Sequence, residues 1–180
     1  PVKSYIENCL KSAAEDGLEI IGLSGGYINI PPQIGSDLRA YFTTFPGAGF
    51  KVPYWWHDGI GAVPTEGFIR QQLITHIKTE LKTCINGFEP FINVFDVNEL
   101  KEPIVDVQFN EDDVSVSLKY PLGLISKRRD LKILIENFGY TVPIRFKKVY
   151  EFAKLIMERE NKDYFIEKKT IDLYSMDVDI

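Results

Sequence analysis

The spacing of apolar residues changes along this chain, and the change limits the folds that the chain can adopt. In two segments before residue 86, apolar residues recur at every third or fourth position, which is the period of one helix face. From Val105 to Tyr120 they recur at every second position, which is typical of strands with one buried face. The pattern predicts an α+β protein in which an antiparallel sheet follows two long helices.

The two N-terminal helices are also marked at their ends. Gly22 and the glycines that follow it end the first apolar stripe. Thr65, a residue type that caps helix N-termini, precedes the second stripe, and Asn86 and Gly87 end it. The stripes consist of Val2, Tyr5, Ile6, Cys9, Leu10, Ala13, Leu18 and Ile21 in the first helix and Ile69, Leu73, Ile77, Leu81 and Cys84 in the second.

The strands of the sheet are predicted on either side of a polar turn at residues 110–112. Residues 105–109 and 114–120 alternate between apolar and polar side chains and predict a hairpin. Residues 131–135 resemble a third strand, and we expect residues 140–142 to prolong it. An antiparallel sheet with one wet face follows from this pattern.

A third helix and a tail follow the predicted sheet. The helix begins at Phe146, and its apolar face extends to Met157 while lysines and glutamates occupy the opposite face. We expect this amphipathic helix to lie across the dry face of the sheet. Residues 164–180 alternate weakly and are expected to add a strand or to form a frayed end.

The connection between the two N-terminal helices is long and rich in proline, glycine and aromatic residues. It spans residues 25–64, a length that is uncommon for a loop in a compact domain unless the loop has a function. Its aromatic content indicates that it folds back on the core. We therefore expect a helical half with an aromatic loop at residues 1–100 and a sheet with a covering helix at residues 101–180, joined in one compact unit of 180 residues.

Composition excludes several classes of function. The formal charge is −5, from 21 basic and 26 acidic residues that are interspersed, so nucleic acid is not an expected partner. The densest basic run, residues 127–129, is followed at once by Asp130 and is typical of a solvated loop. No segment reaches the roughly 18 uninterrupted apolar residues of a membrane helix. The two cysteines and two histidines lack metal-ligand spacing, so no metal or cofactor is predicted.

Cys9 and Cys84 each lie on the apolar stripe of one helix, and two interpretations fit them. If the helices pack antiparallel, the two residues can form a disulfide, which would stabilise the fold by roughly 4 kcal/mol in the chain-entropy model. They can equally be reduced core residues of a cytosolic protein, since a free cysteine packs as a small apolar side chain. The pattern alone leaves both open.

The aromatic run Tyr54, Trp55 and Trp56, followed by His57 and Asp58, is the best candidate for a functional site. Adjacent aromatic rings can stack on a sugar or anchor a peptide or a partner protein. The competing interpretation is a hydrophobic plug that fixes the long loop to the two helices. A third hypothesis, a hydrolase that uses His57 as a general base, is weakened because the chain contains no G-x-S-x-G nucleophile motif.

Five segments resemble a group of uncharacterised archaeal cell-envelope proteins. They are residues 5–10 (YIENCL), 22–28 (GLSGGYI), 53–56 (PYWW), 81–84 (LKTC) and 119–122 (KYPL), so the resemblance extends over most of the chain. Ser24 departs from the pattern, which has a glutamine before the glycine pair. The resemblance implies no catalytic residues.

In that group a single membrane segment typically precedes the domain. The resemblance therefore implies a domain on the outer side of the cytoplasmic membrane, anchored by a segment upstream of Pro1, and an oxidising location favours the Cys9–Cys84 bridge. The leading hypothesis is a noncatalytic envelope domain with a structural or protein-contact role. Its expected partner is another envelope protein or a second copy of itself. The alternative is a glycan- or peptide-binding module that uses Tyr54, Trp55, Trp56 and His57.

Overall fold

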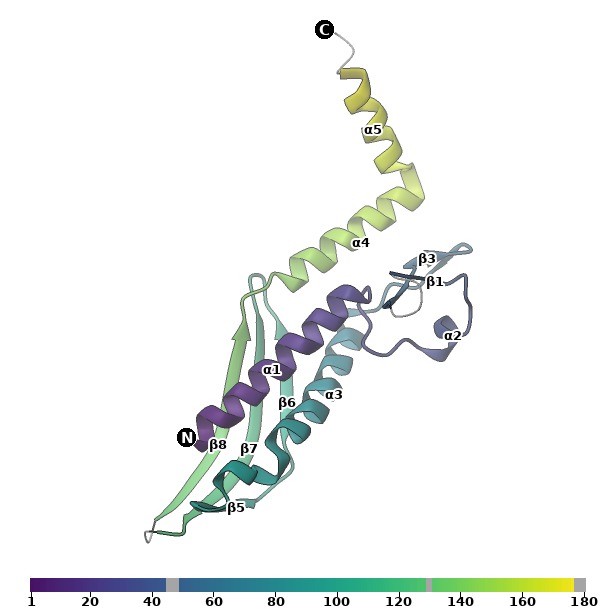
Figure 1. The fold of residues 1–180 in the computed structure, drawn as a ribbon. Coiled ribbons are helices and arrows are strands. Elements are labelled where there is room, and N and C mark those ends of the chain that lie inside the picture. The colour runs from purple at the N-terminus through teal and green to yellow at the C-terminus, as the bar shows by residue number, and fades with distance from the viewer. Residues whose placement is uncertain (45–48, 129–130, 177–180) are drawn as a thin grey trace.

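The computed structural model describes residues 1–44, 49–128 and 131–176, and Figure 1 shows their arrangement. Phe45 of the aromatic loop, Arg129 and Asp130 of the basic run, and the end of the predicted tail after residue 176 lie outside these ranges. The fold is α+β with antiparallel sheets, as the apolar periods predict. Two helices pack on one face of the main sheet, and two further helices project from one end of it (Figure 1).

The two packed helices are α1 (Val2–Leu23) and α3 (Glu66–Ile85). Thr65 caps α3 as predicted, since its side-chain oxygen accepts a hydrogen bond from the backbone N–H of Phe68 at 3.2 Å. Asn86 ends α3 in the left-handed conformation. At Gly17 the helices are so close that a Cβ atom would lie 2.6 Å from Leu73, so this mid-helix glycine permits their contact.

The main sheet is built around one long central strand, β7 (Val114–Ser126). The edge strand β8 (Lys132–Val142) pairs with β7 along nearly its whole length. On the other side, β6 (Ile104–Phe109) pairs with the first half of β7 and β5 (Phe95–Glu99) pairs with the second half. All pairings are antiparallel. The strand β5 and the short 3₁₀ helix η1 (Asn86–Phe91) before it were not predicted from the sequence.

A single apolar core joins the helices to the inner face of this sheet. Helix α1 lies over β8 and α3 lies over β6 (Figure 1). Because the strand period is two, alternate residues of β6 and β7 face the helices while their neighbours face water. Buried core residues of the helices are Ile6, Leu10, Ala14, Ile21, Ile69, Leu73, Ile77 and Leu81, and those of the sheet are Val105, Val107, Val114, Val116, Leu118, Leu122, Leu124, Phe138 and Val142.

The C-terminal helices differ from the sequence prediction. Helix α4 (Phe146–Asp163) does not lie across the sheet, because α1 and α3 already cover its dry face (Figure 1). All of α4 is described, and none of its residues is buried. The predicted strand or frayed end after residue 164 is also wrong for its described part, which forms the helix α5 (Phe165–Met176). None of the helices in the described ranges is both long and apolar enough to cross a membrane.

Helix α4 is attached to the tip of the β6–β7 hairpin at its first turn. Lys147 pairs with Glu111, and Lys148 approaches Asp112 at 2.9 Å. Hydrogen bonds and charge attraction from these lysines lower the pKa of Glu111 and of Asp112. The ring of Phe146 packs on Phe109 with 4.4 Å between centroids. The acidic turn therefore docks a helix.

The two cysteines form a disulfide that joins α1 to α3. Cys9 and Cys84 are bonded, with their Cα atoms 5.8 Å apart, and the hydroxyl of Tyr5 donates to the carbonyl of Cys84 at 2.7 Å beside them. Of the two interpretations of the cysteines, the bridge is the one that the structure has. A disulfide persists in non-reducing surroundings, so it indicates such a compartment for this protein.

Replacement of both cysteines by alanine is expected to lower the free energy of unfolding by about 2–5 kcal/mol, because the bridge closes a long loop of the unfolded chain. Urea denaturation of the Cys9→Ala, Cys84→Ala variant measures this loss, with reduced wild-type protein as the control. Two reactive thiols in the denatured, unreduced wild-type protein would contradict the bridge itself.

Candidate functional site

The aromatic connection between α1 and α3 is folded into small elements. It contains one helical turn, α2 (Pro32–Gly35), and two two-stranded sheets. The first sheet pairs β1 (Tyr41–Thr43) with β2 (Lys51–Pro53). The second pairs β3 (Trp56–His57) with β4 (Ile60–Gly61).

The β3–β4 turn presents part of the candidate site. Asp58 and Gly59 both have positive φ values, 49° and 78°, as a tight two-residue hairpin turn requires. The hairpin therefore holds Trp56 and His57 on a short, defined support.

Partly buried hydrogen bonds fix this connection to α3 and join its two ends to each other. The side-chain oxygen of Gln72 on α3 accepts hydrogen bonds from the backbone N–H groups of Ile28 at 3.1 Å and Asn29 at 2.9 Å. The hydroxyl of Tyr27 donates to the carbonyl of Ala62 at 2.8 Å. Burial raises the pKa of this tyrosine, which keeps it protonated as a donor. The connection that carries the aromatic run is thus held near its start, at residues 27–29, and near its end, at Ala62.

The three adjacent aromatic residues have different surroundings. Trp55 is half-buried, and its indole N–H donates to the carbonyl of Gly25 at 2.8 Å. Its ring meets Tyr150 of α4 edge to face, with 5.9 Å between centroids. Tyr54 and Trp56 are instead 43% and 46% exposed. Trp55 therefore has the contacts of a structural anchor, whereas its two neighbours present rings to solvent.

Two shallow hollows lie between this aromatic run and α4. One is lined by Trp56, Gly61 and Val63 and by Met157, Asn161 and neighbouring residues of α4. The other is lined by all three aromatic residues, by Ile156 and Met157 of α4 and by Ile166 of α5. Since Trp56 lines both, an occupant of either hollow would contact its ring.

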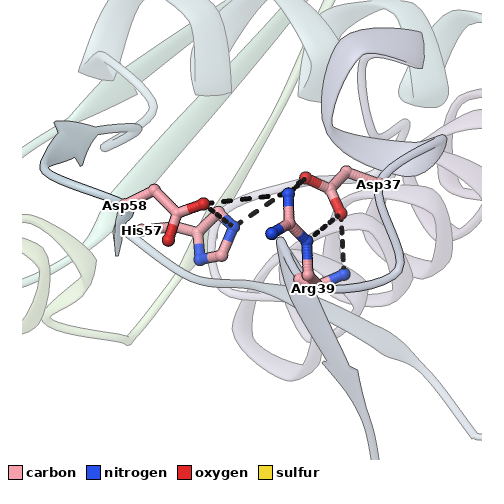
Figure 2. Close-up of polar contacts among 4 residues, drawn as sticks. All are labelled: Asp37, Arg39, His57 and Asp58. Carbon is pink, nitrogen blue, oxygen red and sulfur yellow. Dashed lines mark hydrogen bonds and ion pairs between the residues drawn. The ribbon is translucent and has the colours of Figure 1, made fainter.

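His57 belongs to a charged cluster that links the β3–β4 turn to an earlier part of the connection (Figure 2). Its Nε2 atom lies 3.4 Å from a carboxylate oxygen of Asp58 and 3.8 Å from one of Asp37. Arg39 pairs with both acids, with nitrogen–oxygen distances of 3.3 Å to Asp37 and 3.8 Å to Asp58. The His57 ring stacks beside Tyr54 with 6.4 Å between centroids.

The electrostatics of this cluster are dominated by Arg39. Its backbone N–H and then its guanidinium donate hydrogen bonds to Asp37 and lower the pKa of that carboxyl. The side-chain hydrogen bond to Asp37, followed by the charges of Asp37 and Asp58, raises the pKa of Arg39. Nε2 of His57 is buried and has no hydrogen-bond partner among the described residues. No group of three metal-ligating side chains occurs in the described ranges, and the arginine would repel a cation here.

The sequence identified part of this site and missed the rest. The three adjacent aromatic residues, Tyr54, Trp55 and Trp56, line the surface of the connection that lies nearest α4 and α5. His57 lies beside them in the charged cluster. Asp37 and Arg39 were not singled out, because they precede His57 by many residues in an irregular segment without a motif. The Asp58-Gly59 pair was the one available signal, since it is typical of a hairpin turn.

Comparisons of the chain with protein-family models, with curated proteins and with solved structures found no match.

Replacement of Arg39 by glutamine is expected to raise the pKa of Asp37 towards its ordinary value, because the guanidinium is lost while the backbone N–H still donates. A lowered folded-state pKa stabilises the protein above the unfolded-state pKa, and this contribution is lost as the pH falls through the folded-state pKa. In Arg39→Gln this contribution is therefore smaller, and its loss is complete at a higher pH than in the wild type. Carboxyl titration by NMR measures the shift.

Arg70→Gln is the matched control, since Arg70 pairs with Glu66 on α3. This variant should leave the Asp37 titration unchanged. An unchanged titration in Arg39→Gln would mean that the charged cluster does not form in solution.

Proposed function

We propose that this chain is a noncatalytic domain of a membrane-anchored cell-envelope protein and that it acts through protein contact. The observation that carries the proposal is a disulfide-bonded body from which a largely exposed helical arm projects (Figure 1). The arm is defined as α4 and α5.

The disulfide supports the proposed location in the cell envelope. A Cys9–Cys84 bridge suits the outer side of the cytoplasmic membrane, where thiols are not kept reduced. The resemblance of residues 5–10 and 22–28 to archaeal envelope proteins suggests the same location and an anchor upstream of Pro1.

The exposed apolar residues of the arm support the proposed role in protein contact. Val149, Phe152, Ile171, Leu173 and Tyr174 are each 63–77% exposed, although apolar side chains of this size are usually buried. A run of exposed apolar residues along a helix is typical of a surface that packs against another protein.

The contacts of the charged cluster favour a structural role over a catalytic one. Arg39 pairs with both Asp37 and Asp58, which are partly exposed. Nε2 of His57 has no hydrogen-bond partner among the described residues that would suggest a nucleophile beside it. The ion pairs tie two parts of the aromatic connection together.

Replacement of Phe152 by serine is expected to abolish protein cross-links of the arm in intact cells, because it removes the largest exposed apolar side chain of α4. Formaldehyde cross-linking of the membrane-anchored protein in its own envelope measures this. Glu151→Ser, which changes an exposed polar residue of the same helix without removing an amine that formaldehyde can cross-link, is the matched control and should keep the cross-links.

Two outcomes would contradict the proposal. One is that Phe152→Ser cross-links as the wild type does. The other is that Cys9 and Cys84 are labelled as free thiols in cells quenched with acid, since that would place the domain in a reducing compartment.

A second function is favoured by the exposed ring of Trp56 between two hollows. In this interpretation Tyr54, Trp56 and His57 bind an extracellular glycan or peptide, and Trp55 holds them in place. An aromatic ring at the edge of a hollow can stack on the apolar face of a sugar.

The two tryptophans are expected to respond differently to alanine substitution. Trp56→Ala should weaken glycan binding by about tenfold or more with little change in melting temperature, because the ring is half-exposed. Trp55→Ala should lower the free energy of unfolding by about 2 kcal/mol, because it loses the contacts to Gly25 and Tyr150. A glycan array and thermal denaturation measure these effects. Phe50→Ala, at another exposed aromatic residue of the connection, is the control, and unchanged binding in Trp56→Ala would exclude this function.

A further inference from the structure

The arm carries an apolar stripe that its own fold does not bury. The stripe follows the alternating three- and four-residue spacing of a coiled-coil seam. Its four most exposed apolar members, Val149, Phe152, Ile166 and Leu173, are 51–68% exposed. The arm stripe consists of Val149, Phe152, Ile156, Arg159, Asp163, Ile166, Thr170 and Leu173.

A different face of α4 holds the arm to the body. Phe146 packs on Phe109, and the hydroxyl of Tyr150 donates to the carbonyl of Pro64 at 2.9 Å. In a helix, these two residues are offset from Val149 and Phe152 around the axis. The outer members of the arm stripe therefore face away from the body, and Ile156 and Ile166 border the hollow beside the aromatic run.

The positions of the arm stripe are spaced symmetrically about residue 161, and three of its four symmetry-related pairs are complementary: two are apolar and one is oppositely charged, whereas Phe152 is matched by the polar Thr170. The centre of the stripe is the ion pair between Arg159 and Asp163, whose charged atoms are 3.8 Å apart. Ile156 and Ile166 flank this pair at equal distances along the chain. The outer pairs are Phe152 with Thr170 and Val149 with Leu173.

This symmetry has a geometric consequence for two copies of the chain. When two identical helices pair antiparallel about a two-fold axis, residue i of one contacts residue j of the other, and j contacts i. With the axis beside Asn161, each Arg159 faces Asp163 of the second copy, and each Ile156 faces Ile166. In a parallel pair, Arg159 would instead face Arg159, and Asp163 would face Asp163.

We infer that the partner of the arm is a second copy of this chain, paired antiparallel along the arm stripe with Arg159 and Asp163 forming ion pairs between the copies. The inference rests on the proposed protein-contact function and names the partner. Charge complementarity at the centre of the seam selects this arrangement, because like charges at a partly desolvated interface oppose association.

Pairing along the whole arm stripe requires the arm to straighten. Helices α4 and α5 are separated only by Tyr164, whose φ of 52° lies in the left-handed region. A bulky residue is strained in this conformation, and Figure 1 shows the resulting bend between α4 and α5. If Tyr164 became helical, α4 and α5 would form one continuous helix and the two halves of the stripe would align.

Charge reversal tests the contact between copies. Arg159→Asp alone and Asp163→Arg alone should each raise the dimer dissociation constant by about tenfold or more, since each places like charges opposite one another. An equimolar mixture of the two variants should restore dimers, because every 159–163 contact between the copies is again between opposite charges. Sedimentation equilibrium over a range of concentrations measures both effects.

The mixture separates a contact between copies from a contact within one helix. Each variant keeps its own like-charged pair after mixing, so an ion pair that acted only within the helix would not be restored. A wild-type protein that is monomeric at every concentration, or a mixture that stays monomeric, would overturn the inference.

Two further variants test the orientation and the bend. Val149→Cys and Leu173→Cys should form a disulfide with each other when mixed, and a Leu173→Cys protein that instead links to itself would show a parallel pair. Tyr164→Gly should weaken pairing, because glycine tolerates the left-handed bend, whereas Tyr164→Ala should strengthen it, because alanine favours the continuous helix. Equal affinities would exclude straightening.

These experiments are independent of the test of the proposed function. If the purified chain does not pair but Phe152→Ser still loses its cross-links in the envelope, the self-pairing inference fails and the protein-contact function stands. If Phe152→Ser keeps its cross-links, the proposed function fails whatever the oligomeric state.

Discussion

The packing of α1 and α3 on one face of the main sheet determines where every other part of this protein can lie. The pair buries the inward-facing apolar residues of β6 and β7 and, in β8, Phe138 and Val142, and the bridge between Cys9 and Cys84 holds the helices together at the end that is remote from the aromatic connection. The missing side chain at Gly17 allows the helices to approach further along. Since the inner face of the sheet is then covered, the helices that follow the sheet must extend beyond it.

The sequence predicts those parts of the fold whose surroundings are repetitive. A helix face or an alternating strand repeats one environment over many residues, so α1, α3 and the β6–β7 hairpin are apparent from spacing, and Thr65 and Asn86 mark the limits of α3. An amphipathic pattern identifies an apolar face but does not identify the surface that the face contacts. The apolar face of α4 was for this reason assigned to a sheet that α1 and α3 already cover. Strand β5 was missed because it is short and mostly polar.

The candidate site was predictable in its residue types and not in its geometry. Aromatic residues in a long connection signal a buried or binding role, but spacing cannot show that Trp55 turns towards Gly25 while Trp56 turns towards solvent. Spacing also cannot predict that Asp37 and Arg39 lie beside His57, because this contact depends on how the hydrogen bonds of Gln72 and Tyr27 position the two short sheets. Such contacts between irregular segments carry no local period, so only the folded structure reveals them.

The proposed pairing would couple the aromatic site to the arm through a shared side chain. In the bent arm, Ile166 lines a hollow with Tyr54, Trp55 and Trp56, whereas in the proposed straight pair it would face Ile156 of the second copy. Straightening would then remove one wall of the hollow, and an occupant that contacts Ile166 would favour the bent arm. By thermodynamic linkage, such an occupant would weaken pairing by the same factor by which pairing weakens its binding. The two proposed functions would therefore compete for one surface.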